Sequence, residues 1–461
     1  MQDRIRHIHF VGIGGVGMAG IAEVCLNLGY TVSGSDIQES ANTTRLAALG
    51  ARIFIGHSEQ AVQGADVVVV SSAVPEQNPE IIHARAQRIP VIPRAMMLAE
   101  LMRMRYGIAI AGTHGKTTTT SLTAAILTEG GLDPTYVIGG RLNQTGSHAR
   151  LGASEYLVAE ADESDASFLH LLPHMAVITN IEPDHMGTYG GDFEQLKETF
   201  VQFVQRLPFY GQLIVCNEDE TIRQLLPRFE RHTLTYGLDD SADLWAESIE
   251  FAGLRSHFVL RRGDLALPIT LNMPGEHNVL NALAAAAVAL ELGVAPDAIA
   301  RALEAFHGVG RRFNVYPQRR VGSHCVTLVD DYGHHPTEVG ATLQAAVQAF
   351  PGQRRVLVFQ LHRYSRTAEQ FDRFVSELQQ ADCVILPPVY AAGEAPVPGA
   401  DHRAIAQALR TQGYANVFVS ESLEEARELA EKVVEDGDIL LVLGAGNVGQ
   451  LARQWQQEVC A

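Results

Sequence analysis

The hydrophobic pattern of the chain consists of short apolar runs that alternate with longer stretches of helical periodicity. A first set of runs lies at His7–Val11, 31–35, Arg52–Ile55 and 67–71, with a helical stretch at 18–28. A second set lies at Tyr106–Ala111, 156–159, 175–179 and 213–216, with helical stretches at 117–129 and 278–292. Strands that alternate with helices predict parallel, doubly wound sheets.

A third set of apolar runs begins after residues 311–315. Its members are 326–329, Arg355–Phe359, Cys383–Leu386, Val417–Val419 and Ile439–Leu443. Between the second and third sets, residues 243–271 alternate apolar and polar positions, which predicts an antiparallel appendage. The pattern therefore predicts an α/β protein of three domains: Rossmann-like at 1–105, a central P-loop ATPase-like parallel sheet at 106–312, and Rossmann-like at 313–461.

Composition narrows the class of protein. The 461 residues are 46% hydrophobic and 19% charged, with a formal net charge of −18, which argues against a nucleic-acid or anionic-membrane surface. No apolar stretch approaches the ~18 residues of a membrane span, and the first residues lack the features of a signal peptide, so we expect a cytoplasmic protein. The five cysteines include no close pair, which predicts reduced, packed thiols.

A glycine-rich turn follows the first predicted strand. Gly12, Gly14 and Gly17 satisfy G-x-G-x-x-G between a strand and a helix, and Asp36 follows the second strand. Glycines allow the backbone to approach a diphosphate, and the helix N-terminus presents oriented N–H groups to it. Any nucleotide diphosphate meets that requirement, although the motif alone favours NAD. A tight turn without a ligand is the alternative.

A second glycine turn, at 111–119, carries a lysine and threonines. Its members are Gly112, Thr113, His114, Gly115, Lys116, Thr117 and Thr118. The spacing departs from G-x-x-x-x-G-K-[ST], because position 110 is Ile. The elements of a phosphate loop are still present: backbone N–H groups to surround a phosphate, Lys116 for the terminal phosphates and the Thr117 hydroxyl for Mg²⁺.

Polar clusters follow other strand ends. Residues 160–165 and 180–185 are acidic or contain histidine and follow strands of the same predicted sheet as the phosphate loop, which predicts a Mg²⁺ site. In the third domain, residues 330–336 and 362–367 each follow a strand, where ligands usually bind. Residues 275–281 are interpreted as a helix entry, and residues 444–449 as a glycine turn that serves helix packing.

The order of these motifs, from Gly12 through Gly112–Thr117 to Asp331–His335, resembles the Mur ligases of peptidoglycan synthesis over essentially the whole chain. The strings at 332–336 and 362–367 are similar to those of the alanine-adding members. The resemblance implies an ATP-dependent ligase that joins L-alanine to the lactyl carboxylate of UDP-N-acetylmuramate through an acyl phosphate, releasing ADP and phosphate. The glycine turn would then hold the UDP-sugar instead of NAD.

The same resemblance implies roles for individual residues. The UDP-sugar would contact Gly12, Gly14, Gly15, Gly17, Asp36 and Ser71. ATP would contact residues 112–118 together with Asn278, at the adenine, and Asp331. The metal would be held by Thr117, Glu163 and His185. The amino acid would contact Tyr332, His334, Arg363 and Arg366. Lys116 would act in phosphoryl transfer, and His334 or His335 could take the proton of the amine. Leu361 and Gly187 depart from the residues usual in the family.

Three alternatives to this interpretation are distinguishable. A tripeptide-recycling ligase would act on the same nucleotide sugar. An NAD-dependent oxidoreductase would explain Gly12 to Gly17 but not Lys116, and a regulatory nucleotide switch would explain Lys116 but not the nucleotide-sugar domain. The expected partners are small-molecule substrates, with neither nucleic acid nor membrane, and the protein is expected to be a monomer or a homodimer.

Overall fold

The first domain contains a parallel sheet in which the strand order reverses beside β1. The computed structural model describes residues 4–71, 73–139 and 149–460. Among these residues the sheet order is β3-β2-β1-β4-β5. The elements are β1 (His7–Val11), α1 (Val16–Asn27), β2 (Thr31–Asp36), α2 (Ala41–Ala48), β3 (Arg52–Ile55), η1 (Glu59–Val62), β4 (Val67–Val70), α3 (Pro79–Ala86), β5 (Val91–Pro93) and α4 (Arg94–Arg103).

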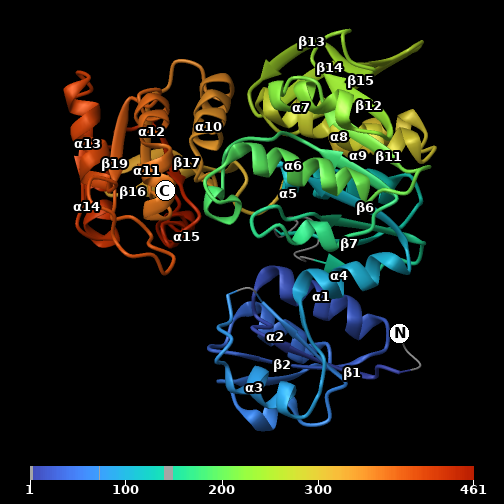
Figure 1. Cartoon of the computed structure of the whole chain (residues 1–461). Helices are drawn as coiled ribbons and strands as arrows, with labels where there is room; N and C mark the ends of the chain where they lie inside the picture. Colours follow the sequence, from blue (N-terminus) through green and yellow to red (C-terminus); the bar gives the residue numbers. More distant parts are fainter. Residues whose placement is uncertain (1–3, 72, 140–148, 461) are drawn as a thin grey trace. The chain divides into compact units, whose positions relative to one another are not determined.

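The reversal of strand order determines where a ligand can approach. Right-handed crossovers on the two sides of β1 put α1 and α3 on opposite faces of the sheet, as Figure 1 shows for the blue part of the chain. The central strands β1 and β4 are buried on both faces, which is why β4 is an unbroken run of valines. The chain leaves β1 at Gly12, at the switch point, so the glycine turn lies where open α/β sheets bind ligands.

The central sheet is larger and is built around β6. In the described part of the chain its order is β15-β14-β13-β12-β11-β10-β6-β9-β7-β8. Its strands are β6 (Tyr106–Ala111), β7 (Thr135–Val137), β8 (Ala149–Arg150), β9 (Tyr156–Glu160), β10 (Met175–Ile178), β11 (Gln212–Cys216), β12 (His232–Gly237), β13 (Leu244–Ala252), β14 (Arg255–Arg262) and β15 (Leu265–Leu271). Its helices are α5 (Lys116–Glu129), η2 (Ser167–His170), η3 (Met186–Tyr189), α6 (Phe193–Gln205), α7 (Glu220–Leu225), η4 (Leu226–Arg228), α8 (Glu276–Glu291) and α9 (Pro296–Glu304).

The position of β6 explains how the sequence motifs meet. β6 pairs in parallel with β10 on one side and with β9 on the other. The carboxyl ends of parallel neighbours lie at one edge, so the loops that begin at residues 112, 161 and 179 emerge together. This is the arrangement that the polar clusters predicted.

The C-terminal sheet has the order β16-β17-β21-β18-β19-β20 within the residues described. Its elements are β16 (Asn314–Val321), β17 (His324–Asp331), α10 (Pro336–Ala349), β18 (Arg355–Phe359), α11 (Tyr364–Glu369), α12 (Phe371–Leu378), β19 (Cys383–Leu386), α13 (His402–Thr411), β20 (Val417–Val419), α14 (Leu423–Val433), β21 (Ile439–Leu443) and α15 (Gly449–Gln457). Alternate residues of β21 enter two separate apolar clusters, so both faces of this sheet are covered by helices.

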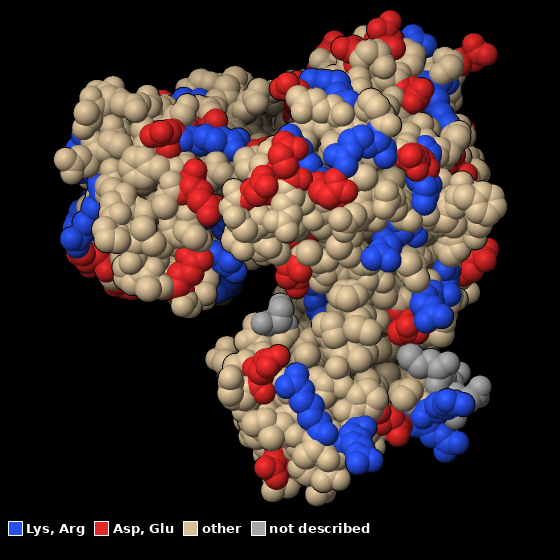
Figure 2. Space-filling model, in the orientation of Figure 1, with Lys and Arg blue, Asp and Glu red and all other residues tan. Residues whose placement is uncertain are grey.

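These three sheets confirm the predicted three-domain α/β fold. By backbone contacts the chain forms two compact units. The first comprises Met1–Glu247, Leu260–Leu267 and Leu280–Phe306, and the second comprises Ser248–Val259, Pro268–Val279 and His307–Ala461. No helix in the described residues has both the length and the apolar character needed to cross a membrane. Figure 2 shows basic and acidic side chains intermixed on the visible face.

The end of the chain is fastened to the edge of the C-terminal sheet. The backbone N–H of Arg320 donates to the carbonyl of Glu458 at 2.7 Å, and the N–H of Cys460 donates to the carbonyl of Gln318 at 3.0 Å. Cys460 forms a disulfide with Cys325 of β17, with the two Cα atoms 6.0 Å apart. The expectation that all five cysteines are reduced thiols was therefore wrong for this pair, whereas Cys25, Cys216 and Cys383 are free and buried.

Reduction of this disulfide is expected to destabilise the C-terminal domain. The bond joins residues 135 positions apart, so it removes much of the freedom of the unfolded chain, and its loss should lower the melting temperature by about 5 to 10 °C. Scanning calorimetry with and without dithiothreitol measures this shift. Cys460→Ser should melt at the lower temperature under both conditions. Identical melting of the wild-type protein in both buffers, with five thiols titratable without reductant, would contradict the assignment.

Candidate functional site

The phosphate loop between β6 and α5 can be built only with glycine at two positions. Gly112 has φ +125°, and a β-carbon there would lie 2.1 Å from Oγ1 of Thr179. Gly115 has φ +84°, and a β-carbon there would lie 2.5 Å from Oδ1 of Asn281. A side chain at either position would thus meet both an unfavourable backbone conformation and a steric clash. The loop passes closely over its neighbours and directs its backbone toward the start of α5.

The loop is held in place by Asn180, the second residue after β10. The backbone N–H of His114 donates to Oδ1 of Asn180 at 2.8 Å, and Nδ2 of Asn180 donates to the carbonyl of His114 at 3.1 Å. The N–H of Thr113 donates to the carbonyl of Asn180 at 3.0 Å. Because β6 and β10 are parallel neighbours, one asparagine can fix the loop before any ligand arrives.

Lys116 forms an ion pair with Glu163 at the centre of this edge. Its Nζ lies 2.9 and 2.8 Å from the two carboxylate oxygens, and it also donates to the carbonyls of Gly112, at 2.6 Å, and Thr113, at 3.1 Å. Burial alone would lower the pKa of Lys116, but the carboxylates of Glu163 and Asp162 raise it above its ordinary value. Burial raises the pKa of Glu163 to about 7, against the opposing effect of the ammonium group. The lysine is therefore kept charged beside the loop.

Oxygen atoms suited to a divalent cation surround this pair. The Thr117 hydroxyl donates to Oε2 of Glu160 at 3.2 Å, and Thr118 is buried in the same turn. His185 lies on the loop after β10, where its Nε2 is 3.5 Å from Oδ2 of Asp184. This loop reaches the acidic segment, since Thr188 donates to the carbonyl of Ser164 at 2.7 Å. The hydroxyl and carboxylate oxygens fit Mg²⁺, which prefers oxygen ligands, whereas an imidazole is a less typical ligand for this ion.

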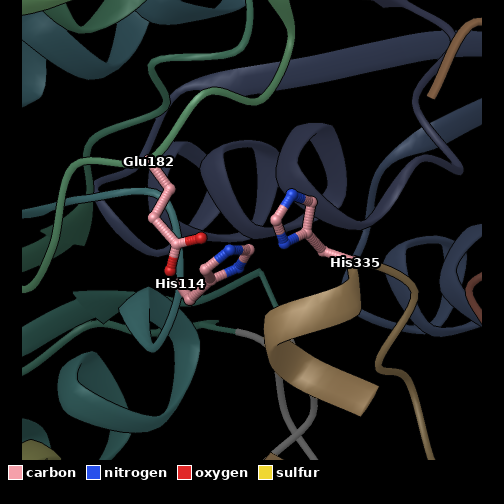
Figure 3. Close-up of side chains that lie close together, drawn as sticks. All are labelled: His114, Glu182 and His335. Carbon is pink, nitrogen blue, oxygen red and sulfur yellow. The ribbon is translucent and has the colours of Figure 1, made fainter. Parts of the chain in front are cut away.

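A second group of potential ligands lies on the same edge. Figure 3 shows the side chains of His114 and Glu182 directed toward one another from the loops after β6 and β10, with ligand atoms within 4.8 Å. The N–H of Glu182 is held by Oγ1 of Thr113 at 2.9 Å. His335, also labelled in Figure 3, belongs to the second compact unit.

The N-terminal glycine turn is ordered by its own hydrogen bonds. The N–H of Gly12 donates to the carbonyl of Ser35 at 2.8 Å, and the N–H of Gly14 donates to Oδ2 of Asp36 at 2.8 Å. Asp36 thus shapes the turn, whatever it contributes to a ligand. Gly15 precedes α1 as its N-cap, and a β-carbon on Gly12 would lie 3.5 Å from Cβ of Ser71. The predicted UDP-sugar residues are therefore together at the switch point.

In the second compact unit a row of aromatic rings lies on the segments that follow β17, β18 and β19. Ring centroids are 5.5 Å apart for Tyr332 and His334, 5.5 Å for His334 and His362, and 5.4 Å for His362 and Tyr390. Nδ1 of His334 lies 3.1 Å from the carbonyl of Tyr332 and 3.3 Å from Oε2 of Glu338. With the proton on Nδ1, Nε2 is the basic nitrogen of this ring.

Three arginines contact these residues, and a fourth, Arg363, lies on the same segment as His362. The guanidinium groups of Arg311 and Arg312 lie 5.2 and 5.4 Å from the centre of the Tyr332 ring. Arg363 is exposed and begins α11 with φ +71°, whereas Arg366 is buried and donates to the carbonyl of His362 at 3.3 Å. β17 and β18 both pair with β21, which explains how the two predicted clusters meet.

Asp331 and Asn278 have structural partners in addition to any ligand. The carboxylate of Asp331 accepts from the N–H groups of Phe313, at 2.7 Å, and Gly333, at 2.6 Å, and burial raises its pKa to about 6. Nδ2 of Asn278 donates to the carbonyl of Pro274 at 2.7 Å. The neighbouring His277 is half-buried near Arg312, and desolvation lowers its pKa to about 4.

Some residues of the site were not predicted. Asn281, which accepts from Thr119 at 3.1 Å beside the phosphate loop, lies within a segment that we interpreted as a helix entry. Glu160 and Asn180 lie in predicted clusters but were not singled out, and Arg312 was not recognised as a neighbour of Tyr332. For Glu160 and Asn180, polarity at a strand end was the available signal. For Asn281 and Arg312 the sequence carries no comparable signal.

Comparison with known proteins covers nearly the whole chain. Residues 7–106 match the model of the Mur ligase family, catalytic domain, residues 110–289 the Mur ligase middle domain, and residues 311–446 the Mur ligase, glutamate ligase domain. The UDP-N-acetylmuramate–L-alanine ligase of Hydrogenovibrio crunogenus is 60% identical over 99% of this chain and 100% of its own length. That of Methylococcus capsulatus is 58% identical over 98% and 96%.

Solved structures resemble the chain over a similar extent. The UDP-N-acetylmuramate–alanine ligase of Thermotoga maritima superposes with a TM-score of 0.81 at 30% identity, covering 98% of each chain. A murein peptide ligase from Psychrobacter arcticus gives 0.71 at 25% identity, covering 99% of each chain. The agreement with both proteins extends across all three sheets.

The environment of His277 predicts a pH dependence of stability. The folded-state pKa of about 4 lies below the ordinary value of 6.5, so between these values the unfolded chain binds a proton that the folded chain does not. Stability from this group is fully present above pH 6.5 and is lost as the pH falls toward 4, by at most on the order of 3 kcal/mol. His277→Gln should flatten the melting temperature against pH in this window, measured by fluorimetry. The exposed His307→Gln should keep the wild-type slope, and equal slopes in all three proteins would contradict the prediction.

Proposed function

This chain belongs to the Mur ligase family, and from that premise we propose that it joins L-alanine to the lactyl carboxylate of UDP-N-acetylmuramate, converting ATP to ADP and phosphate. The curated relatives carry the name of this activity over essentially their full length. One observation supports the chemistry best: Lys116 and two glutamates meet a glycine-rich loop at the carboxyl edge of the central sheet. That arrangement suits phosphoryl transfer, which requires positioning and charge neutralisation.

In the first step the lactyl carboxylate attacks the γ-phosphate, which gives an acyl phosphate and ADP. Lys116 would contact the terminal phosphates while backbone N–H groups of residues 112–117 surround them. In this structure the ammonium group is held by Glu163 and two carbonyls, so phosphate oxygens would take over part of that coordination. Asn180 keeps the loop in its conformation during the exchange.

Mg²⁺ is assigned to Thr117, Glu163 and His185, with Glu160 as a further oxygen donor. A bound Mg²⁺ supplies positive charge that neutralises the phosphate oxygens. These residues would hold the ion, and Tyr189 donates to the carbonyl of Glu163 and so fixes the backbone beside that carboxylate. Asn278 and Asp331 are assigned to the nucleotide of ATP.

In the second step the amine of L-alanine attacks the acyl carbon, phosphate leaves and an amide forms. Nε2 of His334 can accept the proton that the amine loses, because Nδ1 is oriented by Glu338 and the carbonyl of Tyr332. Arg363 and Arg366 are assigned to the alanine carboxylate, with Tyr332 as a wall of the pocket. A guanidinium group can grip a carboxylate with two parallel hydrogen bonds.

The nucleotide sugar is assigned to the N-terminal turn of Gly12, Gly14, Gly15 and Gly17, together with Asp36 and Ser71. The motif taken alone favoured NAD, but because the chain belongs to the Mur ligase family we propose a nucleotide sugar as the ligand of this turn. A tripeptide-recycling activity remains the related alternative, because a murein peptide ligase shares the fold. We place the enzyme in the cytoplasm, where ATP is available, as a monomer or a homodimer.

The first test is phosphate release by a Lys116 variant. Lys116→Ala should reduce phosphate release at least about 100-fold, because one charge that stabilises the transferring phosphoryl group is lost, while UDP-N-acetylmuramate still binds. Lys432→Ala, on the exposed face of α14, is the matched control and should turn over normally. The assay includes L-alanine, the tripeptide and NAD in separate reactions. Phosphate release with the tripeptide but not with alanine would reject the proposed substrate.

The second test concerns recognition of the amino acid. Arg366→Lys keeps the charge but loses the planar guanidinium group that can form two parallel hydrogen bonds with a carboxylate. The kcat/KM for L-alanine should therefore fall about 30- to 1000-fold, equivalent to roughly 2 to 4 kcal/mol. The KM values for ATP and UDP-N-acetylmuramate should stay within about threefold. Arg403→Lys, on the exposed start of α13, serves as the control. A variant that loses ATP affinity but keeps alanine affinity would assign this arginine to the nucleotide.

A further inference from the structure

Arg94 lies at the first position of α4 and extends toward the N-terminal glycine turn. Its Nη1 would lie 3.0 Å from a β-carbon placed on Gly17, and its Cδ and Cζ would lie 3.4 Å from that carbon. Its Nη2 lies 3.5 Å from Oδ2 of Asp162, which follows β9 in the central sheet. All three residues belong to the first compact unit. One guanidinium group therefore joins the nucleotide-sugar turn to the segment that carries Glu163.

This contact gives Gly17 a specific role. The third glycine of such a turn usually permits close packing of helix against strand. Here the absence of a side chain also makes room for the guanidinium of Arg94. Gly17 does not have a positive φ, so alanine could adopt its backbone conformation. An alanine at position 17 would instead displace the side chain of Arg94.

The turn itself provides no positive side chain. Residues 12–17 are Gly-Ile-Gly-Gly-Val-Gly, in a chain with a formal net charge of −18. Backbone N–H groups and the start of α1 carry only partial charge, whereas a diphosphate carries full negative charges. A guanidinium group with five N–H donors matches phosphate oxygens well. Arg94 brings a guanidinium group against this turn at Gly17.

The ion pair with Asp162 is too weak to explain why an arginine is placed beside this turn. It consists of one contact at 3.5 Å, and the two side chains are 26% and 39% exposed. A partly exposed pair with this geometry contributes little to stability. The Arg94–Asp162 pair can keep the guanidinium group near the turn and still break when an anion that binds more tightly is present.

We propose that Arg94 binds the diphosphate of the nucleotide sugar, and that Gly17 is a glycine because a side chain there would displace this guanidinium. The inference rests on the proposed function, since it takes a nucleotide sugar as the ligand of the turn. Arg94 is thus a binding residue of the nucleotide sugar.

The test uses steady-state kinetics of the full-length enzyme. Arg94→Ala should raise the KM for UDP-N-acetylmuramate about 10- to 100-fold, the range expected for loss of a charge-assisted contact. The kcat value and the KM values for ATP and L-alanine should stay within about threefold. Arg94→Lys should recover part of the affinity, and Gly17→Ala should raise the same KM. Arg103→Ala, on the same helix and 58% exposed, should behave as wild type.

Two further measurements separate the diphosphate from other partners of Arg94. UDP-N-acetylglucosamine has the diphosphate but no lactyl carboxylate, and its inhibition constant should rise in Arg94→Ala by the same factor. An unchanged inhibition constant would assign Arg94 to the carboxylate and overturn the proposal. Asp162→Asn should leave the KM for UDP-N-acetylmuramate nearly unchanged. If Asp162→Asn raises this KM as much as Arg94→Ala does, the role of Arg94 is only to link the glycine turn to the segment that follows β9.

The outcomes also distinguish this inference from the proposed function. Wild-type enzyme that releases no phosphate with UDP-N-acetylmuramate and L-alanine rejects the function. Wild-type turnover combined with an unchanged KM in Arg94→Ala rejects the role of Arg94 and leaves the function standing. Circular dichroism of each variant verifies that the fold is retained.

Discussion

The ion pair between Lys116 and Glu163 is the interaction on which the central site depends. A buried ammonium group is stable only if its charge is balanced and its N–H groups are satisfied. Here one carboxylate and two loop carbonyls satisfy it at distances from 2.6 to 3.1 Å. The lysine thereby maintains the conformation of the loop that would receive the phosphates, and the same atoms are available for exchange with a ligand. A loop that is already held in place by the lysine proposed to contact the phosphates is prepared for binding before a ligand arrives.

Much of the fold was predictable because hydrophobic runs and glycine turns have a direct physical meaning. A run such as Ile439–Leu443 is too short for a helix of ordinary length and too apolar for an exposed strand, so a parallel strand buried on both faces was the consistent interpretation. The rule that parallel strands end at one edge then brought Lys116 and Glu163 together before any coordinates were known. The roles of Asn278 and Arg366 came from family resemblance and not from spacing.

The features that the sequence did not predict depend on contacts between residues far apart in the chain. Asn281 meets Thr119 across 162 positions, and Cys325 meets Cys460 across 135. No periodicity encodes such pairs, because the intervening elements decide which of many possible neighbours is reached. The disulfide is the clearest case: cysteine spacing predicted reduced thiols, whereas sheet pairing of residues 458–460 with β16 brings the two sulfur atoms together.

That pairing has a consequence for the solubility of the protein. β16 is the outermost strand of its sheet in the described residues, and an outermost strand presents unpaired N–H and C=O groups that can recruit a strand from another molecule. The tail occupies part of this row through Arg320 and Gln318 and places the charged Glu458 beside it. A recombinant form shortened before Glu458, or fused there to a long flexible tag, would expose the row. Its tendency to aggregate during refolding would then reflect a lost cover on a strand and not a defect of the core.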